Sequence, residues 1–186
     1  LGWAKMHAPS AKMRQSTQDA GRYFSKALSL AESLGLDETL VEVCHDLGRC
    51  HMLRAEPTEC GAAFKRGLDV ALRLGNPGPI CHAEYSLGML KLQVGQSKEA
   101  EQFFLRLRER TRQMGGEKWR EISVFLATTL SEQGRRQEAI TLLESLLTDA
   151  HRVVDPGHPV FVGLEIAMCH QLDGNCDEAL KLYETY

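Results

Sequence analysis

The feature of this sequence that most constrains its fold is an internal repeat of about 40 residues. A glycine, a few polar residues, an alanine and then an apolar pair occur at Gly95–Phe104, Gly134–Leu143 and Gly174–Tyr183. The small residue of this motif recurs at intervals of 40, 40, 39 and 40 residues, as Ala20, Cys60, Ala100, Ala139 and Ala179. A period of this size predicts a stack of similar supersecondary units rather than one layered domain.

Other positions keep the same period. Twelve positions before the small residue of the motif stands a second small residue, as Ala8, Gly48, Gly88, Ala127 and Ala167. Four positions after the small residue of the motif stands a large residue, as Phe24, Phe64, Phe104, Leu143 and Tyr183. Residues 40–53 carry apolar side chains at helical spacing, Pro57 suits the first turn of a second helix, and Gly75 suits its end. Each repeat therefore predicts a hairpin of two helices.

We expect the two helices of a hairpin to approach closely at their small residues, with Gly48 facing Cys60 and Phe64 filling the space between neighbouring hairpins. A lone hairpin cannot bury its apolar face, so the hairpins must stack. The predicted fold class is all-α, a right-handed superhelical solenoid of antiparallel helix hairpins. The chain is read as a single solenoid with hairpins over approximately 1–36, 37–76, 77–116, 117–156 and 157–186.

The two ends depart from the pattern. Pro9 stands where the first helix would be continuous, so the first repeat is expected to be degenerate, with about four full repeats after it. The last helix stops at Tyr186, short of its equivalents. We expect the chain to be a piece of a longer protein.

These residues resemble the tetratricopeptide repeat (TPR) family over nearly the whole chain. The period of 40 is longer than the family's usual period of about 34 residues. It is similar to the long repeats of kinesin light chains, rapsyn and the Leu-Gly-Asn-repeat regulators, and Asp155–Ala167 is similar to the His-Pro start of kinesin light chain repeats. The resemblance implies a concave groove, lined by the first helix of each hairpin, that holds a peptide or helix of a partner protein.

The candidate groove residues share one stripe of each first helix, at fixed offsets from the small residue. The partner-binding candidates are His45, Arg49, Met52, His82, Tyr85, Met89, Leu92, Phe161, Leu164 and Met168. The stripe with Tyr85, Met89 and Leu92 and the stripe with Phe161, Leu164 and Met168 are unusually apolar for a solvated face. Methionine side chains adapt to several partners. The alternative is that neighbouring hairpins, or a flanking helix, cover these side chains.

Several other functions are not expected. Arg49 is the one fixed cation at the sites that match a carboxylate clamp, and the chain has neither a phosphate-binding loop nor a G-x-S-x-G elbow. Glu99, Glu138 and Glu178 fall in first helical turns, where a carboxylate favours the helix dipole. We therefore predict a protein that is not an enzyme, with no catalytic residue and no cofactor.

Cysteine and histidine are adjacent at Cys44–His45, Cys81–His82 and Cys169–His170. Neighbours on a helix point about 100° apart and do not readily share one metal, so we predict no metal site and treat a metal or redox role as a remote alternative. The basic run Arg106–Arg112 is interrupted by Glu109 and lacks interleaved aromatic residues, which argues for a solvated face.

The net charge of −3 argues against a nucleic-acid partner. The sequence has no run of 18 apolar residues, so no membrane span is predicted. We predict a non-catalytic protein-binding scaffold in a cytoplasmic, cytoskeletal or ciliary assembly. The alternative is a self-associating or autoinhibitory solenoid whose groove takes its own flanking segment. A cytoplasmic location is preferred over a secreted one because the cysteine spacing is irregular.

Overall fold

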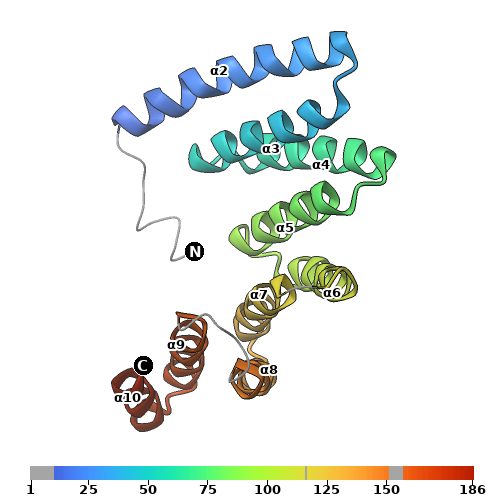
Figure 1. Cartoon of the computed structure of the whole chain (residues 1–186). Helices are drawn as coiled ribbons and strands as arrows, with labels where there is room; N and C mark the ends of the chain where they lie inside the picture. The colour runs from blue at the N-terminus through green and yellow to red at the C-terminus, as the bar shows by residue number, and fades with distance from the viewer. Residues whose placement is uncertain (1–10, 116, 151–156) are drawn as a thin grey trace. The chain divides into compact units, whose positions relative to one another are not determined.

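The structure is a computed structural model that describes residues 11–115, 117–150 and 157–186. The regular structure of these ranges is entirely α-helical (Figure 1). The helices are α2 (Ala11–Leu34), α3 (Asp37–Leu53), α4 (Pro57–Leu74), α5 (Pro77–Gln93), α6 (Ser97–Gln113), α7 (Lys118–Glu132), α8 (Arg136–Ala150), α9 (Gly157–Leu172) and α10 (Cys176–Thr185). The expected break at Pro9 lies outside the described residues.

The helices fall into two compact units. The first unit ends at Gln96 and contains α2 to α5, and the second begins at Ser97 and contains α6 to α10. The division falls between α5 and α6, which the repeat pattern assigns to one hairpin. The single-solenoid reading of the whole chain stays a prediction, and each unit is described by itself below.

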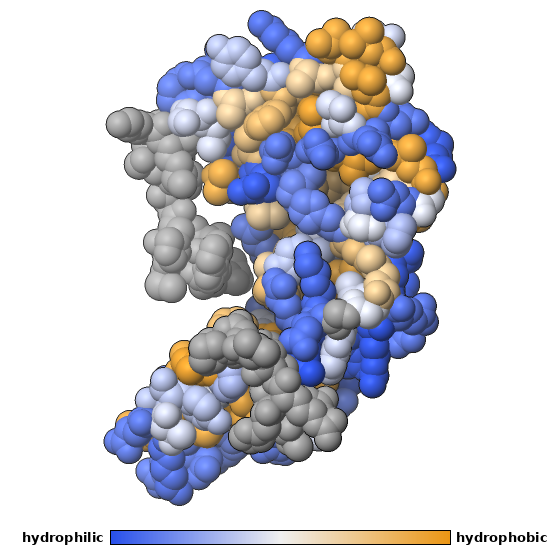
Figure 2. Space-filling view, in the orientation of Figure 1, coloured by the Kyte–Doolittle hydropathy of each residue, from blue (hydrophilic) through white to orange (hydrophobic). Residues whose placement is uncertain are grey.

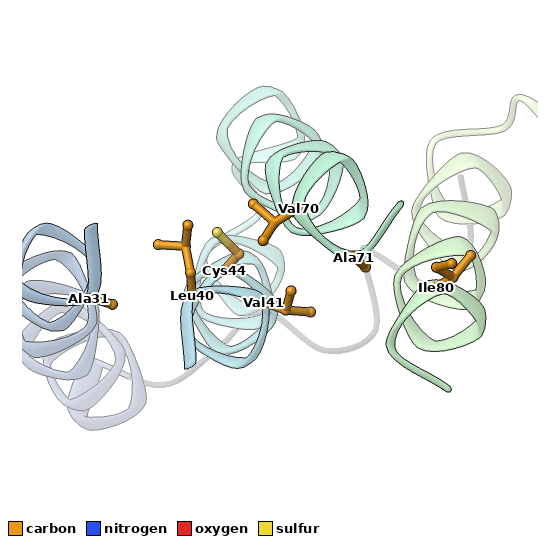
Figure 3. Close-up of a cluster of buried hydrophobic side chains, with 7 residues drawn as sticks. All are labelled: Ala31, Leu40, Val41, Cys44, Val70, Ala71 and Ile80. Atoms are coloured by element: carbon orange, nitrogen blue, oxygen red, sulfur yellow. The ribbon is translucent and has the colours of Figure 1, made fainter. Parts of the chain in front are cut away.

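A string of buried apolar side chains joins all four helices of the first unit (Figure 3). It runs through Ala31 of α2, through α3 and α4, and on to Ile80 of α5. The middle of the string is formed by Leu40, Val41, Cys44, Val70 and Ala71. Each helix therefore buries its apolar stripe against the next helix in sequence, as expected of stacked hairpins rather than of a bundle around one centre.

The helix ends coincide with glycines. Gly75 has φ 66° and closes α4 in the left-handed conformation, which costs a glycine nothing because it has no Cβ. The hinge inside a hairpin uses the same conformation at Gly95, Gly134 and Gly174. In the hairpin of α3 and α4 the equivalent residue is Ala55, with φ 58°. Ala55 is the one non-glycine with positive φ among the described residues, so this hinge carries strain that the other hinges avoid.

An aromatic ring of α4 makes the closest contact with the small residue of α3. A Cβ built on Gly48 would lie 2.4 Å from Cε1 of the Phe64 ring, and its nearest neighbours belong to Phe64 rather than to Cys60. Phe64 is 2% exposed and also stacks on the ring of His45, at 5.6 Å between ring centroids. The Phe64 ring thus fills space within its own hairpin and makes the closest approach to Gly48, while the expectation that Gly48 faces Cys60 stays a prediction.

The second unit repeats this packing with different side chains. Phe104 of α6 is fully buried and stacks on Phe125 of α7, at 5.9 Å between ring centroids, so here the aromatic ring does join one hairpin to the next. Leu143 and Leu146 of α8 are also buried, and Arg136 pairs with Asp173 at 2.9 Å. Since Asp173 comes directly after α9, this ion pair joins the start of α8 to the end of the next helix.

The first repeat lacks a hinge. The residue equivalent to Ala55 and Gly95 is Gln15, and α2 continues through it as one helix from Ala11 to Leu34. The fold-class prediction of an all-α stack of helix hairpins is confirmed for the described residues. No helix within these ranges combines the length and the apolar character needed to cross a bilayer.

Candidate partner-binding surface

The candidates of the first unit lie on α3 and α5, and two histidines connect the two helices. The rings of His45 and His82 are 3.9 Å apart between centroids. Nδ1 of His45 lies 3.2 Å from Oγ of Ser86. The Ser86 hydroxyl donates its single proton to the backbone oxygen of His82, so Nδ1–H of His45 must donate to Ser86. These contacts bring two of the predicted residues, His45 of α3 and His82 of α5, together.

His45 stays neutral at physiological pH. Burial lowers the pKa of His45 to about 4, and the positive charge that His82 can carry acts in the same direction. Asp46 opposes both effects. A neutral His45 that packs on Phe64 and His82 is therefore part of the packing between consecutive first helices as well as of the surface.

The remaining candidates of the first unit differ in exposure. Arg49 is exposed, and its Nη1 lies 3.9 Å from Oδ1 of Asp46, a weak surface pair. His82 is exposed as well. The other four candidates, Met52, Tyr85, Met89 and Leu92, are half-buried. The face therefore combines a cation with partly covered apolar side chains.

The candidates of the second unit form an exposed apolar stripe on α9. Phe161, Leu164 and Met168 are 48%, 38% and 42% exposed, and Leu172 extends the stripe by one turn. The spacing of three and four residues puts these side chains on one side of the helix. Figure 2 shows patches of hydrophobic residues over α9 and α10 among hydrophilic ones. These side chains are therefore exposed in the described part of the unit.

Comparison of equivalent positions shows which element covers such a stripe inside a unit. Val124 of α7 is equivalent to Leu164, and it is only 2% exposed. The next first helix, α9, packs against α7, and Oγ1 of Thr128 lies 3.4 Å from Oε2 of Glu165 across this contact. Within this unit, the residue three positions before the small residue of α7 is therefore a packing residue, which favours the packing alternative for His45.

Sequence reasoning missed a polar site between α2 and α3. Nε and Nη2 of Arg54 donate to Oε2 of Glu56, at 2.9 and 2.6 Å. Nδ1 of His51 lies 2.7 Å from the same oxygen, and hydrogen bonds from His51 and Arg54 hold the pKa of Glu56 below its ordinary value. A cavity of about 600 Å³ opens beside Arg54. The feature of the sequence that could have indicated this site is Gly21, which follows Ala20, the small residue of the first repeat.

The cysteines and the basic run behave as packing and surface residues. Cys44, Cys50, Cys60 and Cys169 are buried and Cys176 is exposed, all as free thiols. Burial raises the pKa of Cys44 to about 11. Within the described ranges, no group of three or more histidine, cysteine or acidic residues is placed to hold a metal ion. Arg106 lies over the ring of Phe103, at 4.9 Å from its centroid.

This arrangement defines the class of fold. Residues 125–160 match the family described as tetratricopeptide repeat, which confirms the resemblance of the sequence to that superfamily. No curated protein sequence matches the chain. The chain has the fold of a TPR-like solenoid.

Three solved structures illustrate this similarity, and all are too distant in sequence to show more than the fold. The putative kinesin light chain repeats from Podosopora anserina are 17% identical, with a TM-score of 0.81 over 98% of this chain and 88% of that chain. The Rap conjugation gene regulator of plasmid pLS20, in complex with a peptide, is 17% identical (TM-score 0.68; 91% of this chain, 46% of that one). YrrB, a TPR protein with an unusual peptide-binding site, is 16% identical (TM-score 0.59; 99% and 90%).

Proposed function

We propose that this chain is a non-catalytic protein-interaction scaffold that binds a peptide or helix of a partner on the first helices of its hairpins. TPR-like repeats generally mediate protein–protein interaction, and two of the structural neighbours bear names that state peptide binding. The observation that carries the proposal is the exposed stripe of Phe161, Leu164 and Met168 on α9. Apolar side chains that lie contiguously on a surface mark interaction sites.

The face of the first unit would contribute in the same way. Tyr85 and Met89 present an aromatic ring and a flexible thioether, and Arg49 adds a charge that can orient a peptide. The similarity to kinesin light chain repeats favours a cytoplasmic location and a cytoskeletal or ciliary assembly. This part of the proposal rests on family analogy alone.

A pull-down from extract compares the wild-type chain with the double variant Tyr85→Ala/Met89→Ala and with Phe161→Ser/Met168→Ser. If the proposal is right, at least one double variant loses the captured partner while its helical circular dichroism and melting temperature stay close to those of the wild type. An exposed control, Ser145→Ala on α8, should retain the partner. Retention of the same partner by both double variants contradicts the proposal.

The second candidate function is self-association through the first helices, the alternative that the sequence leaves open. Light scattering at increasing concentration distinguishes the two functions, because a scaffold stays monomeric without its partner.

A further inference from the structure

The two units contain the same kind of helix junction with different contents. Glu101 of α6 and Gly21 of α2 are equivalent residues, because each follows the small residue of the repeat motif, Ala100 or Ala20. At the junction of α6 and α7, the Glu101 carboxylate accepts hydrogen bonds from Nε2 of Gln133 at 2.9 Å and from Nη1 of Arg135 at 2.8 Å. Burial raises the pKa of Glu101, but these hydrogen bonds outweigh burial and keep it below its ordinary value. A mostly buried carboxylate is therefore stable at this place.

At the junction of α2 and α3, the donor is present and the carboxylate is not. Arg54 is equivalent to Gln133, since each stands six residues after the small residue of its helix and caps that helix. Gly21 offers no side chain, and a Cβ built on it would lie 3.1 Å from Nη1 of Arg54. The cavity of about 600 Å³ is lined by both residues. The chain thus has an arginine pointing at the place where its other unit holds a carboxylate.

The guanidinium of Arg54 is held in position from behind. Its Nε and Nη2 both donate to Glu56, and His51 supports the same carboxylate oxygen. Within the described part of the chain, Nη1 of Arg54 donates to no acceptor. The Arg54 side chain is 19% exposed, so an anion that reaches Nη1 would meet a donor that is oriented and largely removed from water.

The charge of the cavity also favours an anion. Its lining includes three fixed cations, Arg22, Lys26 and Arg54, against one carboxylate, Asp19, in a chain with a net charge of −3. Glu56, beside the lining, pairs with Arg54 and offsets one of these charges. Asp19 lies 3.6 Å from Arg22 and offsets part of this charge. We propose that the cavity between α2 and α3 binds an aspartate or glutamate side chain of an acidic partner peptide, with Nη1 of Arg54 as the anchor. None of the residues that line this cavity is among the candidate residues on α3, α5 and α9, so the proposal does not depend on the proposed function.

The direct test titrates the ¹⁵N-labelled chain with capped hexaglutamate and follows the Nε–H resonance of Arg54 by NMR. Capped hexaglutamine and inorganic phosphate are the comparison probes. We expect saturable binding of hexaglutamate, at least about tenfold tighter than that of hexaglutamine, because a charge-assisted hydrogen bond to arginine is lost with the amide. No saturable shift with hexaglutamate, or phosphate binding as tight as that of hexaglutamate, overturns the proposal.

Two pairs of variants make the test specific. Arg54→Met should weaken hexaglutamate binding at least about tenfold, whereas Arg73→Met, which removes an exposed arginine of α4 from its pair with Asp37, should change it less than about twofold. Equal losses in the two variants would show unspecific charge attraction and overturn the proposal.

The second pair of variants changes Gly21 and keeps Arg54, so it remains informative if Arg54→Met does not fold. Gly21→Glu places a carboxylate in the cavity, as Glu101 does in the other unit, and should abolish hexaglutamate binding. Gly21→Gln has similar size and helix propensity but no charge, and should leave more of the binding intact. Gly21→Glu should also melt at a higher temperature than Gly21→Gln. Equal affinity and equal melting temperature for the two variants would contradict the proposal.

Discussion

Replacing Gly48 by alanine tests the packing of the α3–α4 hairpin. The added Cβ would lie 2.4 Å from Cε1 and 2.5 Å from Cδ1 of Phe64, whereas carbon atoms in contact stay about 3.5–4.0 Å apart. The ring must therefore retreat by roughly 1 Å. Phe64 is 2% exposed and stacked on His45, so no open space receives it.

The size of the effect results from two opposing contributions. Overpacking a dense core costs about 1–3 kcal/mol, and the rigid, enclosed ring puts this site at the upper end. Alanine in place of glycine inside a helix gains about 1 kcal/mol. We expect Gly48→Ala to lower the free energy of unfolding by about 2 kcal/mol, which corresponds to a fall of about 4–8 °C in melting temperature for a chain of this size.

Thermal and urea denaturation, monitored by circular dichroism at 222 nm, measure this change. Gly61→Ala in α4 is the matched control, because its Cβ would lie 3.3 Å from the flexible end of Leu90. That variant should be neutral or slightly more stable. Combining Gly48→Ala with Phe64→Leu should restore part of the loss. If Gly48→Ala is as stable as Gly61→Ala, the close contact between Gly48 and the ring is refuted.

Three further predictions concern backbone strain, protonation and thiol reactivity. Ala55→Gly should raise the free energy of unfolding by about 1 kcal/mol in chemical denaturation, because it relieves the left-handed strain at φ 58°, while Ala62→Gly in the exposed part of α4 should lower it by about 1 kcal/mol. The folded state keeps His45 neutral until about pH 4, whereas the unfolded chain protonates it near pH 6.5. The free energy of unfolding should therefore fall as the pH drops through this window, by at most about 3 kcal/mol. The variant His45→Gln should reduce this fall. Cys176 should react with a thiol reagent in the native state, whereas Cys60, whose pKa burial raises to about 12, should react only after unfolding; fast native labelling of Cys60 would contradict its burial.

The repeat period predicted the helices and their ends because local chemistry determines both. Gly75 closes a helix through a conformation that glycine adopts freely, and Pro57 starts one because its missing N–H would be unsatisfied there anyway. From α4 to α8, the burial of the small residue and of the large residue four positions later was also predictable from the period: Cys60, Ala100, Ala139, Phe64, Phe104 and Leu143 are at most 2% exposed.

The partner of Gly48 could not be read from spacing alone. Side chains on a helix tilt toward its N-terminus, so the ring of Phe64 reaches back over the turn that contains Cys60 and covers Gly48 itself. The candidate stripe was affected in the same way, because a helical stripe predicts which residues share a side but not which neighbour covers them. Val124 and Leu164 occupy the same position of the repeat, and Val124 is the buried one because α9 packs against its helix.

The site beside Arg54 was also beyond local reasoning. Gly21 and Arg54 lie 33 residues apart and belong to different helices, and no pattern within either helix links them. Their relation emerges only when the junction of α2 and α3 is compared with that of α6 and α7. The absence of a side chain at Gly21 is informative because Glu101 fills the equivalent place.

Site-specific photo-cross-linking in cells tests most directly the claim that the first helices bind a partner. A benzoylphenylalanine at position 161 replaces a side chain that is 48% exposed on α9, and the same group at exposed Ser145 of α8 is the control. The account predicts a discrete adduct from position 161 that maps to one segment of one partner and is absent from position 145. No adduct from position 161, or the same adducts from both positions, would contradict it.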